Sequence, residues 1–297
     1  MNKKTIKFLS TILAMLCLLF VSACGGSNDE NGNTGIDDAT ATITLQPEIS
    51  ELTVTRGTAT GHWKADNTEA VAVKIGSTVK QYKVNSKKVL VSDAPFTWND
   101  EGLKDHSSKT IEAWYPYTAS LPTSITVKSN QSSESNFDGS DFLYGTANIT
   151  YHSNDWVYPI TFYHQVAKLH ITVTKAADDN RTISSVQINN VYLNGTFTAP
   201  STGNQGTWST SGSKGTISAY NSPVAWDALL IPQTIPASTA FITINLGGDA
   251  YTFTTTEPFA MNGNKQYNCA FTINKNDLRF KITVTPWTTG ASKQLPF

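Results

Sequence analysis

Alternation of apolar and polar residues, repeated along the chain, constrains the fold more than any other feature of this sequence. It occurs in seven segments: 71–77, 110–117, 168–174, 185–193, 240–246, 251–256 and 278–287. A period of two over about four to eight residues is typical of half-buried strands. Clusters of Gly, Asn, Ser and Pro between the segments predict turns. After the first 23 residues, no stretch repeats apolar residues at the helical spacing of three and four. The sequence therefore predicts an all-β protein built as an antiparallel β-sandwich.

The phase of the alternation changes within one stretch, YPITFYHQVAKLHITVT. Apolar residues and one histidine occupy the even positions from 160 to 166, whereas apolar residues occupy the odd positions from 169 to 173. A strand can change phase only through a bulge or by crossing from one core to another. We therefore predict two tandem domains, at 42–159 and 160–297.

The chain begins with an export signal. Lys3, Lys4 and Lys7 precede an apolar run of 14 residues from Phe8 to Val21, which is shorter than the roughly 18 residues of a spanning helix. The sequence VSAC then ends in Cys24, a pattern that resembles the lipobox of bacterial lipoproteins. This resemblance implies a signal peptide at 1–23 and acylation of the Cys24 sulfur. An ordinary secretory signal with an incidental Cys24 is the alternative. Residues 24–41 are acidic and rich in glycine, which predicts a flexible tether.

Cysteine usage excludes an internal disulfide. Cys17 leaves with the signal and Cys24 carries lipid, so the mature chain keeps only Cys269 as a thiol. Cys269 alternates with apolar neighbours, which predicts a small buried side chain rather than a nucleophile.

Charge and motifs exclude several functions. The chain has 15% charged residues and a formal net charge of −1, which gives no electrostatic signature for nucleic acid. It lacks the motifs of serine hydrolases, phosphate loops and zinc proteases. His164 and His170 are the closest pair of histidines, but the phase change separates their faces, and His164 is predicted to be a hydrogen-bonded core residue. We expect no catalytic residue, cofactor or metal.

Several motifs together resemble one family. They are the lipobox, VTRGTATGHWKADNTEAVAV, WYPY, DFLYGTA, ITFYHQVAKLHITV and a final ITVTPW. In this order they resemble the fimbrillin family of Bacteroidetes, the subunits and accessory proteins of type V pili. The resemblance implies two tandem transthyretin-like β-sandwich domains and export to the outer membrane as a lipoprotein.

The resemblance also implies assembly by strand exchange. Structural subunits of the family are cut after a basic residue, which removes the lipid and a first strand, and another subunit's terminal strand fills the groove. The matching position is Arg56, followed by Gly57. Arg56 is the first basic residue after Cys24, and six acidic residues lie between them. The alternatives are a solvated Arg56 that is not cut, or an anchoring member that keeps its lipid.

The C-terminal tail, TTGASKQLPF, is a less suitable donor strand. Ala291, Leu295 and Phe297 have the alternation that a groove requires, whereas Pro296 lacks an N–H group and Lys293 adds a charge. A minor, tip or anchor subunit therefore remains an alternative to a stalk subunit.

A second function class is open from sequence alone. An outer-membrane lipoprotein could bind glycan through exposed loop aromatics, for which Trp208 is the best candidate, although aromatics in β-sandwiches usually serve the core. The favoured interpretation is a non-enzymatic, surface-exposed fimbrillin-like pilus component that contributes to adhesion. Its expected partners are other fimbrillin-like subunits, the outer membrane and a surface receptor.

Overall fold

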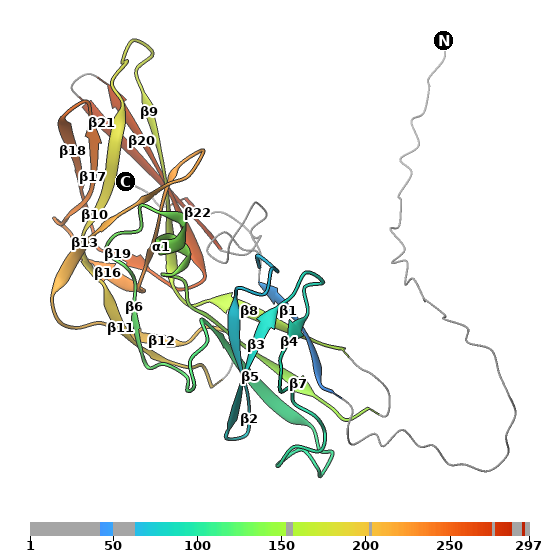
Figure 1. The fold of residues 1–297 in the computed structure, drawn as a ribbon. Coiled ribbons are helices and arrows are strands. Elements are labelled where there is room, and N and C mark those ends of the chain that lie inside the picture. The colour runs from blue at the N-terminus through green and yellow to red at the C-terminus, as the bar shows by residue number, and fades with distance from the viewer. Residues whose placement is uncertain are drawn as a thin grey trace, which may run out of the picture. The chain divides into compact units, whose positions relative to one another are not determined.

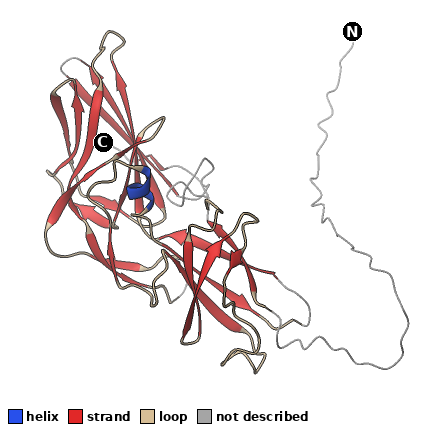
Figure 2. Cartoon of the chain, viewed as in Figure 1, coloured by secondary structure: helices blue, strands red, loops and turns tan. Residues whose placement is uncertain are grey.

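The computed structural model describes residues 42–49, 63–152, 157–201, 204–274, 277–286 and 293–294. These residues belong to one compact unit, Asp37–Phe297. Figure 2 shows that they form almost only strands. The described residues contain one short helix. The all-β prediction is confirmed. No helix in these ranges has the length and hydropathy needed to cross a membrane.

The first sheet has seven strands and closes on itself as a barrel, in the order β1-β4-β3-β2-β5-β7-β8 (Figure 1). Its strands are β1 (Thr44–Ile49), β2 (Ala70–Ile75), β3 (Thr78–Val84), β4 (Leu90–Val91), β5 (Lys109–Tyr115), β7 (Leu143–Ile149) and β8 (Val157–His164). Their inward residues form one hydrophobic cluster, the barrel core, which includes Val73, Tyr82 and Phe162. A closed barrel differs from the open sandwich expected for this half of the chain.

The second half contains two larger sheets that pack face to face. One has the order β13-β10-β17-β18 and the other β14-β15-β9-β20-β21-β22. Their strands are β9 (Ala167–Lys175), β10 (Ile183–Tyr192), β13 (Lys214–Ser218), β14 (Tyr220–Asn221), β15 (Trp226–Leu230), β17 (Ala240–Leu246), β18 (Asp249–Thr254), β20 (Lys265–Asn274), β21 (Asp277–Pro286) and β22 (Lys293–Gln294). Residues from both sheets share a second hydrophobic cluster, the sandwich core. Phe253 of β18 contacts Phe271 of β20 across it, with ring centroids 5.9 Å apart.

Two small sheets and one helix complete the described fold. The sheets are β12-β11-β6 and β16-β19, made by β6 (Ser124–Thr126), β11 (Asn194–Thr198), β12 (Thr207–Ser209), β16 (Gln233–Ile235) and β19 (Phe259–Met261). The helix α1 (Glu134–Asp138) lies in the predicted loop at 128–141. Ser133 caps it by accepting a hydrogen bond from the Asn136 N–H group, and Phe137 anchors it by stacking on Tyr220.

Strand pairing corrects one expectation. Most pairs are antiparallel, but β1 pairs with β8 and β9 pairs with β20 in parallel. The prediction of a purely antiparallel arrangement is therefore wrong at these two places. Local alternation carries no information about the direction of a strand's distant partner.

The phase change at 160–173 marks a crossing between the two cores. Phe162 belongs to the barrel core, whereas Val166 and Leu169 belong to the sandwich core. The chain changes cores between β8 and β9 rather than bulging within one strand. The domain limits predicted at 42–159 and 160–297 stay predictions.

Candidate strand-exchange site

The first strand of the barrel lies between two others. β1 pairs in parallel with β8 at six positions, from Thr44 opposite Val157 to Ile49 opposite Phe162. On its other side it pairs with β4 at a single position, Leu45 opposite Leu90. We call the gap between β4 and β8 that this strand fills the β1 slot. Most of the strand's main-chain pairing is therefore with β8.

Side chains of β1 alternate between the barrel core and solvent. Leu45, Pro47 and Ile49 are buried, whereas Gln46 and Glu48 are exposed. Burying an aliphatic side chain contributes about 1.5–3 kcal/mol, so the apolar face rather than pairing alone holds the strand in place.

The walls of the β1 slot are apolar too. Tyr158, Ile160 and Phe162 of β8 are buried and alternate with more exposed residues, and Leu90 is buried on the β4 side. Without β1 these side chains would lose their cover. An empty slot would therefore present a continuous apolar groove to another extended segment.

Close packing behind β8 shapes the slot. β7 runs antiparallel to β8 and comes close to it at Gly145, where an added Cβ atom would lie 2.2 Å from the carbonyl oxygen of Thr161. Thr161 is also the β8 residue opposite Glu48. Glycine at 145 thus allows β7 to approach the strand that pairs with β1.

The chain re-enters the described structure just beyond the slot, at Trp63. This side chain is 9% exposed and contacts Tyr115 and Phe162 edge-on, with ring centroids 5.8 and 5.2 Å apart. Its indole N–H group is buried and has no hydrogen-bond acceptor. The sequence used Trp63 only as part of a motif, because a single aromatic residue in a polar stretch gives no sign of its packing.

An ion pair fixes the residue after Trp63. The Lys64 ammonium lies 3.0 Å from a carboxylate oxygen of Asp138, and the Lys64 N–H group donates to Glu69 at 2.6 Å. The contact with Asp138 raises the pKa of Lys64. Burial raises the pKa of Glu69 to about 7 and also raises the pKa of Asp138. These carboxyl groups are unfavourably placed for ionisation, and Lys64 partly compensates for that.

The predicted processing and lipid residues lie outside the described ranges. These are Cys24, Arg56, Gly57, Ala291, Leu295 and Phe297. Between the tail residues, Lys293 and Gln294 form β22 and pair with Val284 and Thr283 of β21.

The histidines lie in separate environments. His164 is fully buried, with Nδ1 3.0 Å from Asp141, as expected for a core histidine. His170 Nδ1 lies 2.7 Å from Asp227. Burial opposes ionisation of Asp227, but His170 and Lys168 outweigh it and hold the pKa of that carboxyl below its usual value. Within the described ranges, no group of three or more His, Cys, Asp or Glu residues is arranged to hold a metal.

Cys269 and the tryptophans give a mixed result. Cys269 is 1% exposed and free, and burial raises the pKa of its thiol, so the prediction of a buried side chain is confirmed. Trp208 does not lie exposed in a loop. It belongs to β12 and packs on Phe197, with ring centroids 5.2 Å apart, and its indole N–H group is buried. The prediction that Trp208 is an exposed aromatic is wrong, because Gly195 of β11 has no side chain and leaves room for its ring, and Phe197 packs against it.

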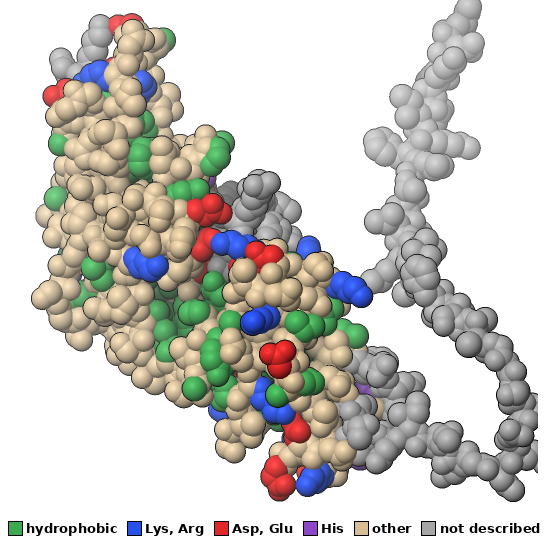
Figure 3. Space-filling view, in the orientation of Figure 1, with side chains coloured by type: hydrophobic (Ala, Val, Ile, Leu, Met, Phe, Trp, Pro, Cys, Tyr) green, Lys and Arg blue, Asp and Glu red, His purple; other side chains and the backbone are tan. Residues whose placement is uncertain are grey.

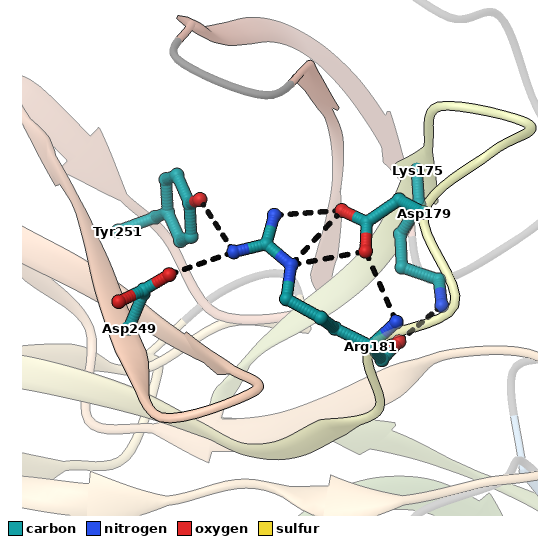
Figure 4. Close-up of polar contacts among 5 residues, drawn as sticks. All are labelled: Lys175, Asp179, Arg181, Asp249 and Tyr251. Atoms are coloured by element: carbon teal, nitrogen blue, oxygen red, sulfur yellow. Dashed lines mark hydrogen bonds and ion pairs between the residues drawn. The ribbon is translucent and has the colours of Figure 1, made fainter.

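A second polar cluster joins the turn before β10 to the β17–β18 hairpin (Figure 4). The Arg181 guanidinium lies 2.7 Å from both Asp179 and Asp249 and donates to the Tyr251 hydroxyl at 3.1 Å. Gly247 has a φ of +60°, and an added Cβ atom there would lie 2.6 Å from the Arg181 side chain. The cluster braces two connections of the sandwich.

The fold and the β1 slot define an all-β protein with two packed cores, whose first described strand closes a barrel between β4 and β8. Residues 53–287 match the fimbrillin-like family, and the chain belongs to that family. A comparison with curated proteins gives no match.

Solved structures resemble this chain at low identity, and the two with TM-scores above 0.6 share its fold. A proposed cell adhesion protein from Bacteroides ovatus ATCC 8483 gives a TM-score of 0.65 at 16% identity, with 85% of this chain and 100% of that chain covered. A proposed cell adhesion protein from Bacteroides uniformis ATCC 8492 gives a TM-score of 0.62 at 17% identity, with 84% of this chain and 100% of that chain covered. The tip fimbrial protein Mfa3 from Porphyromonas gingivalis, with C-terminal truncation, gives a TM-score of 0.47 at 8% identity, with 82% of this chain and 99% of that chain covered.

Proposed function

We propose that this protein is a non-enzymatic subunit or accessory component of a cell-surface fimbria, assembled by strand exchange at the β1 slot. Membership of the fimbrillin-like family supports a fimbrial role. The proposed partners are other fimbrillin-like subunits, and the proposed contribution is to adhesion.

The pairing of β1 is the observation that carries this proposal. β1 is the first strand of the described chain, and its main-chain pairing is mostly with β8. Arg56 lies in the sequence between β1 and β2, so a cut there would separate β1 from every other strand. The barrel would then keep its other six strands and an apolar slot.

Exchange at this slot conserves the interactions that hold β1. An extended segment of another subunit can form the same main-chain hydrogen bonds with β8 and bury apolar side chains at alternate positions. Because the cut chain no longer tethers β1, the bound strand can dissociate and a neighbour can replace it. The tail with Ala291, Leu295 and Phe297 is the segment of this chain that we propose as donor.

Lipidation of Cys24 would deliver the precursor to the outer membrane. Its acyl chains contribute about 0.8 kcal/mol per buried CH₂ group, which holds a protein with two or three chains firmly. A cut after Arg56 would release the protein from that anchor. We further propose that the two cores correspond to tandem domains that meet near residue 160, and that the second domain has a transthyretin-like build.

The N-terminus and mass of the protein recovered from cells test the proposal. We expect a chain that begins at Gly57 in assembled fimbriae and an acylated Cys24 in the precursor. Arg56→Ala should leave the acylated precursor uncut, whereas Lys64→Ala, at the next basic residue, should leave processing unchanged.

Two results would contradict parts of this scheme. Acylated Cys24 in every recovered molecule would exclude processing and favour an anchor. A mature chain without lipid that begins at residue 24 or earlier would exclude both lipidation and release.

A further inference from the structure

One of the two large sheets of the sandwich ends at an edge strand, β18. This strand pairs with β17 along its whole length, from Asp249 opposite Leu246 to Thr254 opposite Ala240. Among the residues that the structure describes, no strand pairs with the other side of β18. The main-chain N–H and C=O groups that point away from β17 therefore lie at an open edge of the sheet.

The hairpin geometry identifies these main-chain groups. β17 and β18 are joined by a turn of two glycines, so the flanking residues Leu246 and Asp249 form a hydrogen-bonded pair. Hydrogen-bonded and non-hydrogen-bonded pairs alternate along an antiparallel ladder. The main-chain groups of Ala250, Thr252 and Thr254 consequently point to the open edge, and all three residues are exposed.

β18 differs from the other edge strands of the two large sheets. At the end of β13, Ser218 donates to the Ser129 carbonyl at 2.8 Å and accepts the Gln131 N–H group at 3.0 Å, so this edge is partly covered. β14 and β22 have only two described residues each. β18 has six residues, DAYTFT, and contains no Lys or Pro, which natural proteins place on edges to prevent pairing. Its edge is therefore suited to pairing with another chain.

Contacts within the sandwich hold β18 without help from a partner. The Arg181 guanidinium lies 2.7 Å from Asp249 and donates to the Tyr251 hydroxyl at 3.1 Å (Figure 4). Phe253 contacts Phe271, with ring centroids 5.9 Å apart. The edge is thus ordered in advance, which lowers the entropic cost of docking a second strand.

The sequence of β18 favours a second copy of the same strand as the partner. When two copies run antiparallel with Thr252 opposite itself, Ala250 lies opposite Thr254. The outward main-chain groups of these three residues then meet one another. On the inner face Tyr251 lies opposite Phe253, and aromatic cross-strand pairs are stabilising.

Other registers of this pair are less favourable. A shift by one residue would place outward main-chain groups opposite groups that already bond to β17. A shift by two residues would leave one of the three outward residues opposite a residue outside β18. With Thr252 opposite itself, the only charged residue of the strand, Asp249, lies opposite Thr255, so no like charges meet.

We propose that the β18 edge is an interaction surface for a second copy of this protein, which docks antiparallel with Thr252 on the two-fold axis. The sheets β13-β10-β17-β18 of the two copies then form one continuous sheet. The contact does not involve the β1 slot, so it forms whether or not the chain is cut at Arg56.

Charge substitution on the axis tests this contact. The chain from residue 24 would carry Cys24→Ser and Arg56→Ala, so that it is neither acylated nor cut at that site. Sedimentation equilibrium up to about 1 mM protein should show a reversible dimer. Thr252→Lys places two ammonium groups opposite each other and should weaken the dimer at least about tenfold. Thr254→Lys is the matched control, because it adds the same charge to the same strand but opposite Ala250. It should change the dissociation constant by less than about threefold.

A mixing experiment separates loss of the contact from loss of the fold. Thr252→Glu alone should also weaken the dimer, because two carboxylates then meet at the axis. An equimolar mixture of Thr252→Lys and Thr252→Glu should form a heterodimer at least as stable as the parent dimer, since opposite charges then pair.

Three results would overturn the proposal. The first is a parent that stays monomeric at about 1 mM. The second is equal weakening by Thr252→Lys and Thr254→Lys, or a mixture that does not recover the dimer. The third is a monomeric parent that binds a peptide of residues 288–297 and loses this binding on Thr252→Lys, because the edge would then belong to the tail of a neighbouring chain.

Discussion

Glu69 is an acidic residue in a buried environment. It is 5% exposed, and its carboxylate accepts the N–H group of Lys64. Burial raises its pKa from an ordinary value of 4.5 to about 7, although Lys64 opposes the shift. The folded protein therefore binds a proton between these pH values that the unfolded chain has released.

This difference predicts that stability falls as pH rises from about 5 to about 7 and that the loss persists above that range. Glu69→Gln removes the titration. Between pH 5 and pH 8 this titration should lower the unfolding free energy of the parent by about 2 kcal/mol. The Glu69→Gln variant should not show this loss. Urea denaturation at both pH values measures this. An equal difference between the two proteins at both pH values would show that Glu69 does not titrate on folding.

The side-chain amide of Gln131 forms the hydrogen bonds that a neighbouring strand would otherwise form with Leu229. The residue is fully buried, its amide nitrogen donates to the Leu229 carbonyl at 2.8 Å, and its amide oxygen accepts the Leu229 N–H group at 2.8 Å. The main chain of Gln131 also donates to Ser218 of β13 at 3.0 Å. Gln131 thereby joins the edge of one large sheet, at Ser218, to the edge of the other, at Leu229. Because it lies in a polar loop, its sequence context gives no sign of this role.

Gln131→Leu should therefore destabilise the protein by about 2–4 kcal/mol, because two main-chain groups of Leu229 lose their partners in a buried place. Gln81→Leu is a matched control, since Gln81 is exposed on β3. We expect the control to change the unfolding free energy by less than about 0.5 kcal/mol. Similar losses in both variants, measured by chemical denaturation, would refute the role of the Gln131 amide.

At the scale of elements, the alternation of apolar and polar residues predicted several strands. β2, β5, β9, β10 and β17 lie in segments where the sequence alternates. β3 and β7 were not predicted as separate strands. The outer face of β3 is polar, and β7 contains Gly145, which breaks its apolar series but is required by contact with Thr161.

The candidate site was predictable only in part. The sequence suggested a removable first strand before Arg56, and the structure has β1 there, with Leu45 and the preceding Ile43 both buried. It could not show that β8 is the main partner, because more than a hundred residues separate the two strands. It also could not reveal the packing of Trp63, which depends on contacts with residues of β5 and β8.

Gly145→Ala tests the approach of β7 to β8. Its Cβ atom would meet the main chain of Thr161, which cannot move without disturbing the pairing with β1. We expect a loss of about 2–4 kcal/mol in unfolding free energy. Gly76→Ala is the control, because Gly76 has a φ of +58° but open space around it, and should cost about 1 kcal/mol. Equal costs, measured by denaturation, would contradict the close approach.

At the scale of the whole molecule, the two cores share a boundary made of side chains. Ala72, Trp114 and Tyr144 lie on barrel strands but belong to the sandwich core. Phe197 of β11 contacts Phe142 and Tyr144, with ring centroids 4.9 and 6.0 Å apart. Figure 3 shows apolar side chains gathered on the visible face between charged ones. Loss of either core would therefore expose apolar surface of the other.

This shared boundary predicts one cooperative thermal transition, with calorimetric and van't Hoff enthalpies equal within error. Phe197→Ala should weaken the coupling, because it removes a ring that contacts residues from the barrel half of the chain. We expect a loss of about 3–5 kcal/mol and two resolved transitions. Phe271→Ala is the matched control, since Phe271 is 1% exposed within the sandwich. It should lower the transition temperature but leave a single transition. Two transitions in the parent, or one in Phe197→Ala, would show that Phe197 does not couple the cores.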